Sequence, residues 1–221
     1  MSNEWTTGIP GLDTYAKPEA MSLWLIASPP GMGKTARTLD MAAAAYREGR
    51  RVMILSYEMA ALHLLTRLGA RGVALEDVPR PRLAIRSLAR GTPLPEADIT
   101  TFAPDLLIVD TLSAACQQVG VSYLPSVVAD AAQMLAGMAL DRNCCIVTTA
   151  QTGRSMDPRG DTQRLLPTYE KVDVALLCHC PYETPRPYII DVVKNGRGQL
   201  GRITLRLVPS EARAVEEVLV A

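Results

Sequence analysis

A short loop near the N-terminus carries the residues with the clearest chemistry. Residues 28–35 follow an apolar run at 23–27 and lead directly into a stretch without Pro or Gly at 35–48. They therefore join a strand to a helix, the context of a Walker A motif, although Ser28 replaces its first glycine. Loop amides and the helix N-terminus attract phosphate. We expect Lys34 to reach the terminal phosphates and Thr35 to bind Mg²⁺. The predicted nucleotide-binding residues are Pro30, Gly31, Met32, Gly33, Lys34, Thr35 and Ala36.

Two carboxylates follow apolar runs farther along the chain. Asp110 ends the run 106–110, the form of a Walker B strand whose Asp holds Mg²⁺ through water. Glu58 follows the run 52–56, so in a parallel sheet it emerges at the edge where the phosphate loop lies. A carboxylate there can orient the water that attacks the γ-phosphate. The structural alternatives are a helix-capping Asp110 and a solvated Glu58 at the end of a strand.

The order of apolar runs predicts the fold class. Runs that alternate with helix-like stretches indicate an α/β fold, a mainly parallel twisted sheet with helices on both faces. Helices are expected at 35–48 and 126–140. After Cys180 the pattern changes to two alternating strands around a Gly-rich stretch, which predicts a C-terminal β-hairpin within 186–208. We expect a single domain over 1–221 with an N-terminal arm at 1–20. The predicted core strands are 23–27, 52–56, 106–110, 144–149 and 174–178.

Composition limits the partners of the chain. Lys and Arg number 23, as do Asp and Glu, so no global positive field attracts nucleic acid and any such contact must be local. The apolar runs are too short to span a bilayer, which predicts a soluble, cytoplasmic protein with no membrane partner. Five cysteines, an odd number, indicate reduced thiols. Residues 178–180 read Cys-His-Cys but lack a second ligand pair, so we expect no metal there.

Several segments, taken together, resemble a known family. Residues 7–13, 30–35 and 56–59 and the strand that ends at Asp110 are similar to the RecA-like core of DnaB-type replicative helicases, with KaiC- and RadA-like ATPases as relatives. The likeness continues through 149–151, 169–173 and 194–198 and so covers nearly the whole chain. It implies a RecA-like P-loop fold that binds ATP and Mg²⁺.

The resemblance also implies roles for individual residues. Glu58 matches the catalytic base, Gln151 the polar residue that senses the γ-phosphate, and Lys194 with Arg197 the cations that reach a neighbouring subunit's nucleotide. In the usual helicase pattern the Arg stands two residues after the Lys, where this chain has Gly196, so Arg197 is displaced by one. The alternatives are a Gln151 that satisfies local backbone and two cations at a solvated hairpin tip.

Family members hold nucleic acid in loops after the third and fourth core strands, here 113–125 and 152–167. In the second loop Arg154, Arg159 and Arg164 lie among flexible glycines. They are predicted to contact DNA phosphates without reading bases. An ordinary surface loop of mixed charge is the alternative.

These observations predict an ATP-hydrolysing DnaB-like DNA helicase or helicase-like motor that acts on single-stranded DNA as a ring. Few residues precede Thr6, so the core itself would form that homo-oligomer, a hexamer by resemblance, with a replication or loader protein as a further partner. The alternative is a RadA- or KaiC-like ATPase switch, or a replication or recombination accessory protein, without unwinding activity. The two classes share a nucleotide site and differ in assembly and in what the loops hold.

Overall fold

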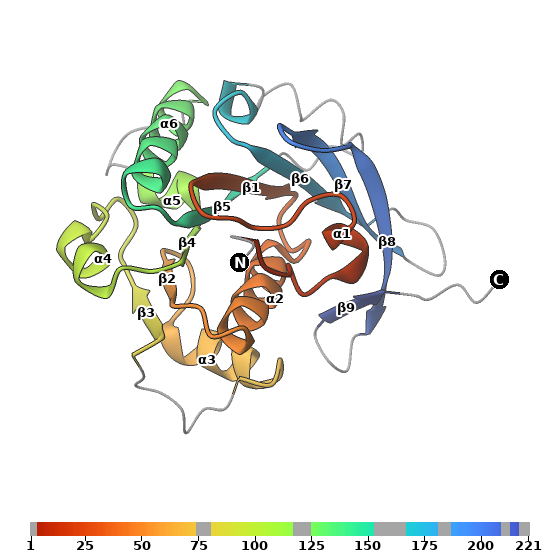
Figure 1. Ribbon diagram of the computed structural model, residues 1–221, viewed down its shortest axis with the longest axis horizontal. Coiled ribbons are helices and arrows are strands. Elements are labelled where there is room, and N and C mark those ends of the chain that lie inside the picture. Colours follow the sequence, from red (N-terminus) through yellow and green to blue (C-terminus); the bar gives the residue numbers. More distant parts are fainter. Residues whose placement is uncertain are drawn as a thin grey trace.

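A computed structural model describes residues 4–73, 81–116, 125–152, 167–180, 187–208 and 213–216. In these residues one sheet of nine strands has the order β3-β2-β4-β5-β1-β6-β7-β8-β9 (Figure 1). Strand β1, in the interior of the sheet, is buried along its whole length. The strands are β1 Ser22–Ser28, β2 Val52–Ser56, β3 Leu83–Ser87, β4 Leu106–Asp110, β5 Cys145–Gln151, β6 Val174–His179, β7 Pro187–Asn195, β8 Gly201–Val208 and β9 Arg213–Glu216.

The sheet has a parallel part and an antiparallel part. Strands β3, β2, β4, β5, β1 and β6 pair in parallel, while β7, β8 and β9 continue the sheet in antiparallel pairs. Ser28 lies opposite Gln151, and Ser56 lies opposite Asp110. The ends of four parallel strands therefore meet at one carboxyl edge, which is where ligands bind in open α/β sheets.

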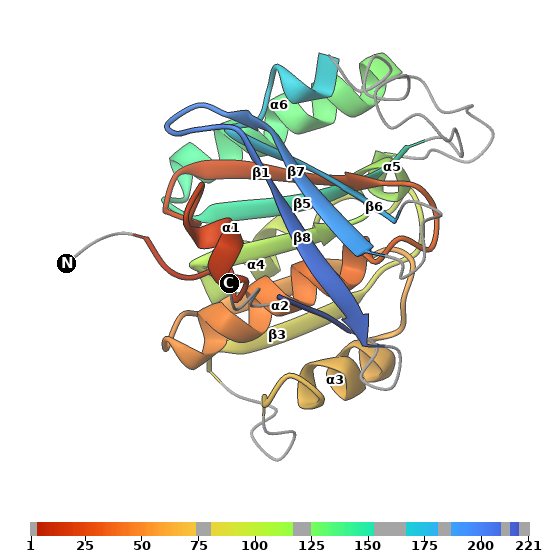
Figure 2. The same ribbon diagram turned by 90° about the vertical axis from the view of Figure 1, so that its right-hand side faces the viewer.

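Helices cover both faces of the sheet. Along β1 the side chains alternate, so that Trp24 and Ile26 join the core beneath α2 and α3, whereas Leu23 and Leu25 join the core beneath α5 and α6. Figure 2 shows α6 above the strands and α3 below them. The predicted α/β class, with a parallel sheet, helices on both faces and a C-terminal hairpin, is confirmed. The helices are α1 Pro10–Asp13, α2 Lys34–Arg47, α3 Ala61–Gly69, α4 Glu96–Phe102, α5 Leu112–Cys116 and α6 Pro125–Asp141.

Two strands, β3 and β9, were not predicted from the sequence. In β3 only Leu83 is buried, and Arg86 pairs with Asp98 on α4 at 3.0 Å. β3 is an edge strand beside β2, and its pairing rather than an apolar run stabilises it. β9 likewise forms by pairing with β8. The predicted helices at 35–48 and 126–140 correspond to α2 and α6 within one or two residues at each end.

The N-terminal segment packs on the same core. Trp5 is buried, its backbone N–H donates to Pro18, and the Arg50 guanidinium lies 4.9 Å from its ring. Asp13 accepts hydrogen bonds from the backbone N–H and the hydroxyl of Thr7. Within the described ranges, none of the helices combines the length and the apolar character needed to cross a bilayer.

Candidate functional site

The loop between β1 and α2 has the backbone of a phosphate cradle. Gly31 and Gly33 have φ of 74° and 77°, the left-handed region that favours glycine, and Gly33 is the N-cap of α2. A Cβ placed on Gly31 would meet no atom within 4 Å, so this part of the loop is open to a ligand. The first turn of the 14-residue helix α2 directs its amides toward the same space.

Lys34 begins α2 and is nearly buried, with 9% of its surface exposed. Its Nζ lies 3.3 Å from the carbonyl oxygen of Ser28 and 3.5 Å from that of Pro29. Burial lowers the pKa of the Lys34 ammonium, although the charges of Asp110 and Glu58 offset part of that effect. The folded protein thus holds a poorly solvated cation over the loop, and an incoming phosphate would stabilise it.

Asp110 joins three elements at the carboxyl edge. It ends β4, is 2% exposed, and accepts hydrogen bonds from the hydroxyls of Thr35 on α2 at 2.8 Å and Thr149 on β5 at 2.6 Å. A hydroxyl and a carboxylate oxygen side by side are the oxygen donors that Mg²⁺ prefers. The pair Thr35 and Asp110 therefore fits a magnesium site. Thr149 was missed from the sequence, where its one signal is a polar residue inside an apolar strand.

Glu58 follows β2 and lies beside Asp110. The backbone N–H of Tyr57 donates to the carbonyl of Asp110 at 2.7 Å, which places Glu58 at the next strand end. Its side chain is 36% exposed, and its Oε1 lies 3.4 Å from the hydroxyl of Thr111 and 3.5 Å from Nη2 of Arg90. No sequence pattern pointed to Arg90, which reaches Glu58 from the segment between β3 and α4.

Gln151 ends β5 at the same edge. It lies opposite Ser28 in the register of β1 and β5, its side chain is exposed, and the next residue, Thr152, donates its N–H to the carbonyl of Ser28 at 3.0 Å. The fold therefore brings together five of the residues singled out in the sequence: Lys34, Thr35, Glu58, Asp110 and Gln151.

Lys194 and Arg197 lie at the opposite edge. Strand β7 runs antiparallel to β6, so its end at Asn195 lies beside Val174, where β6 begins. Figure 2 shows the β7–β8 turn at the left, away from the loop that follows β1 at the right. Neither cation can therefore reach the phosphate loop of its own chain.

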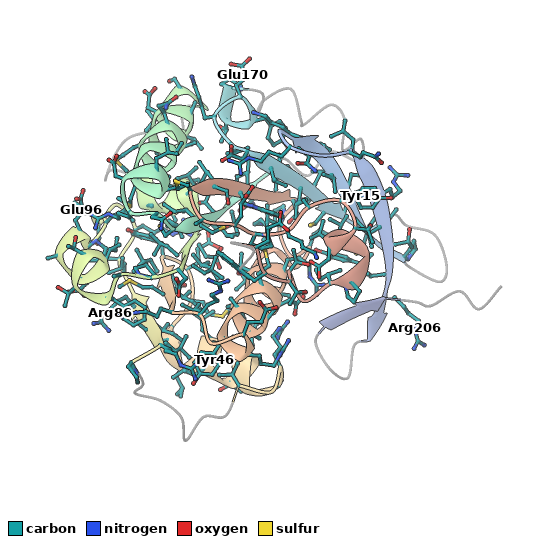
Figure 3. All side chains as sticks on the ribbon, in the orientation of Figure 1. Tyr15, Tyr46, Arg86, Glu96, Glu170 and Arg206 are labelled. Atoms are coloured by element: carbon teal, nitrogen blue, oxygen red, sulfur yellow. The ribbon has the colours of Figure 1, made fainter. Side chains whose placement is uncertain are left out.

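Both cations have partners within the chain. Lys194 donates to the carbonyl oxygens of Tyr169 at 2.8 Å and Glu170 at 3.1 Å. Arg197, 59% exposed, pairs with Glu19 at 2.5 Å. The turn itself is anchored by Asn195, whose side chain donates to the carbonyl of Tyr15, labelled in Figure 3. The position of Arg197 thus depends on an ion pair at the surface that another charged partner could replace.

The remaining predicted site residues fall elsewhere. Arg154, Arg159 and Arg164 lie outside the described residues. Of the Cys-His-Cys segment, Cys178 is buried, and His179 contacts Asp191 at 3.0 Å. In the ranges that the structure describes, no three His, Cys, Asp or Glu side chains come close enough to hold a metal ion.

Comparison with known proteins agrees with this arrangement. Residues 5–91 match the model of the DnaB-like helicase C-terminal domain family. The structure resembles the solved ATPase domain of a DnaB-like helicase with a TM-score of 0.78 and 16% sequence identity, over 96% of this chain and 90% of that one. No curated protein sequence gives a significant match. The resemblance to a DnaB-like, RecA-like core is thereby confirmed. It supports a role of the helicase family, with the nucleotide use that such ATPase domains have.

Proposed function

We propose that this chain is an ATP-hydrolysing, DnaB-like motor that acts on single-stranded DNA as a ring. The observation that carries the proposal is the meeting of Lys34, Thr35, Asp110 and Glu58 at one edge of the sheet. Three of these four residues lie within the segment that matches the DnaB-like family. ATP is the proposed substrate and Mg²⁺ the proposed cofactor.

The phosphate loop binds the triphosphate. Amides of the loop and of the first turn of α2 donate to the phosphates, and Lys34 supplies a positive charge to the terminal ones. Thr35 and Asp110 hold the Mg²⁺, which when bound neutralises charge on the phosphates. Thr149 keeps the Asp110 carboxylate in place through its hydrogen bond of 2.6 Å.

Glu58 acts as the base that orients the attacking water. Its two contacts, at 3.4 Å and 3.5 Å, are longer than ordinary hydrogen bonds, so the carboxylate can turn toward a water molecule. Gln151, next to Ser28 on the neighbouring strand, lies where an amide can contact the γ-phosphate. The proton of the water passes to the Glu58 carboxylate as the oxygen attacks phosphorus.

Hydrolysis depends on assembly in this proposal. Because Lys194 and Arg197 lie at the edge opposite their own phosphate loop, the nucleotide that they contact belongs to a neighbouring copy of the chain. A cation supplied in this way stabilises the charge that develops on the transferred phosphoryl group. We propose a homo-oligomeric ring, a hexamer, in which each interface completes one site.

DNA binding is assigned to the segment after β5. Arg154, Arg159 and Arg164 follow the strand that ends beside the phosphate loop, so a contact with DNA there lies next to Gln151. Arginines that contact phosphates bind without sequence preference, and salt weakens that binding strongly.

The proposal is tested by the rate of ATP hydrolysis with and without a single-stranded oligonucleotide, over a range of salt concentrations. We expect stimulation of several-fold that declines as salt rises. Lys34→Ala should lose nucleotide binding, whereas Glu58→Gln should bind ATP and lose at least about 100-fold in turnover. Normal turnover in Glu58→Gln would remove Glu58 from the role of base.

Particle mass separates the motor from the alternative class. With Mg²⁺, a non-hydrolysable ATP analogue and the oligonucleotide, a motor should form a ring of defined mass. A hydrolysing monomer that ignores DNA would instead favour a RadA- or KaiC-like switch or an accessory protein without unwinding activity. The ion pair of Arg197 with Glu19 within one chain is the observation that keeps this alternative in the test.

A further inference from the structure

Tyr188, at the start of β7, touches the phosphate loop directly. Its side chain is 3% exposed, and its hydroxyl donates to the carbonyl oxygen of Met32 at 2.9 Å. Its ring and hydroxyl also lie 3.5 Å from where a Cβ of Gly33 would be. A residue 156 positions away in sequence thus contacts the two residues in the middle of the loop.

Peptide geometry gives this contact a consequence for ligand binding. In a trans peptide unit the C=O and the following N–H point in opposite directions. When Tyr188 holds the Met32 carbonyl, the Gly33 N–H of the same unit points away from Tyr188. Gly33 has a φ of 77° and, as a glycine, could otherwise change its conformation easily. The hydrogen bond therefore fixes the direction of one loop amide.

The tyrosine is itself held in place. The guanidinium of Arg37, on α2, lies 5.1 Å from the centre of its ring, and Arg37 pairs with Asp40 at 2.9 Å. The Cys178 thiol on β6 hydrogen-bonds the Tyr188 hydroxyl. Burial raises the pKa of Tyr188 well above its ordinary value, so the hydroxyl stays protonated and remains a donor. Strand β7, helix α2 and the loop are thus joined through one side chain.

We infer that Tyr188 is a positioning residue, which orients the Met32–Gly33 peptide for phosphate binding and joins the nucleotide site to the strand that leads to Lys194 and Arg197. The inference rests on the proposed function of the site. Strand β7 spans roughly 23 Å from Tyr188 to Asn195 at about 3.3 Å per residue. One continuous strand therefore links the phosphate loop to the cations proposed to act on a neighbouring copy.

The test compares two substitutions that each remove one buried tyrosine hydroxyl. Tyr188→Phe deletes the hydroxyl bonded to Met32. Tyr46→Phe is the matched control, because Tyr46, labelled in Figure 3, lies on α2 and its buried hydroxyl has no hydrogen-bond partner among the described residues. Loss of one neutral hydrogen bond should weaken binding of a non-hydrolysable ATP analogue by about three- to tenfold in Tyr188→Phe. In Tyr46→Phe the affinity should stay within about twofold of wild type.

The readouts separate positioning from a purely structural role. For positioning, KM for ATP rises while kcat at saturation changes little, and the amides of residues 29–35 exchange hydrogen faster in nucleotide-free Tyr188→Phe than in Tyr46→Phe. A lower melting temperature with wild-type affinity and wild-type exchange would overturn the inference and leave the proposed function intact. If the wild-type protein does not bind the analogue, both the proposed function and the inference fail.

Discussion

The hydroxyl of Thr149 can be removed with little change in shape, because Thr149→Val replaces it with a methyl group. Thr149 is fully buried and donates to the Asp110 carboxylate at 2.6 Å. Its neighbour on β5, Thr148, is equally buried and donates to the carbonyl of Val109 at 3.0 Å. Thr148→Val is therefore a matched control that differs mainly in the charge of the acceptor.

The expected magnitude follows from that charge. A hydrogen bond to a charged group contributes about 1.5–3 kcal/mol to the free energy of unfolding, and one between neutral groups about 0.5–1.5 kcal/mol. The two variants should therefore differ by about 1–1.5 kcal/mol. In a domain of this size 1 kcal/mol shifts the melting temperature by about 2–4 °C, so Thr149→Val should melt about 2–6 °C below Thr148→Val.

Thermal unfolding by circular dichroism, without nucleotide and at pH 7, measures the difference in stability. Titration with a Mg²⁺-bound ATP analogue then measures affinity, which should fall in Thr149→Val and stay near wild type in Thr148→Val, because only Thr149 holds the carboxylate proposed to bind Mg²⁺. Equal melting temperatures for the two variants, or a lower one for Thr148→Val, would refute the assignment of Thr149 as the residue that holds Asp110.

Three further predictions concern charge. Lys34→Met should raise the melting temperature of the nucleotide-free protein and abolish ATP binding: the pKa of Lys34 lies below its ordinary value of 10.5, so the charged amine destabilises the fold at pH 7, and a lower melting temperature would contradict this. Arg197→Ala, titrated into wild-type protein, should reduce ATP hydrolysis more steeply than dilution does, and a linear loss would exclude action in trans. Burial tends to raise the pKa of Asp191, but hydrogen bonds from Arg202 and His179 lower it below 3.8 overall, so this carboxylate stabilises the fold above that pH and the contribution is lost as pH falls through the folded-state pKa. Asp191→Asn should accordingly melt below wild type at pH 7, with a difference that shrinks in melts at pH 3 and below.

Local sequence was enough to predict the elements and the phosphate loop. Residues 28–35 are consecutive, and the apolar runs on either side of the helix-like stretch specify a strand and a helix without help from distant residues. Because parallel strands end at the same edge, it also placed Glu58 and Asp110 with Lys34 in one site, an arrangement that the register of β2 and β4 shows. The catalytic roles of these residues stay predictions.

The tertiary structure alone decided which distant side chains touch. Thr149 and Asp110 meet because β5 lies beside β4, and Tyr188 reaches Met32 because β7 folds back along β6. It also placed Arg197 at the edge opposite the phosphate loop, a direction that the sequence of a hairpin does not contain. Periodicity and turn residues act over a few positions, whereas the order of strands in a sheet depends on burial summed over the whole chain.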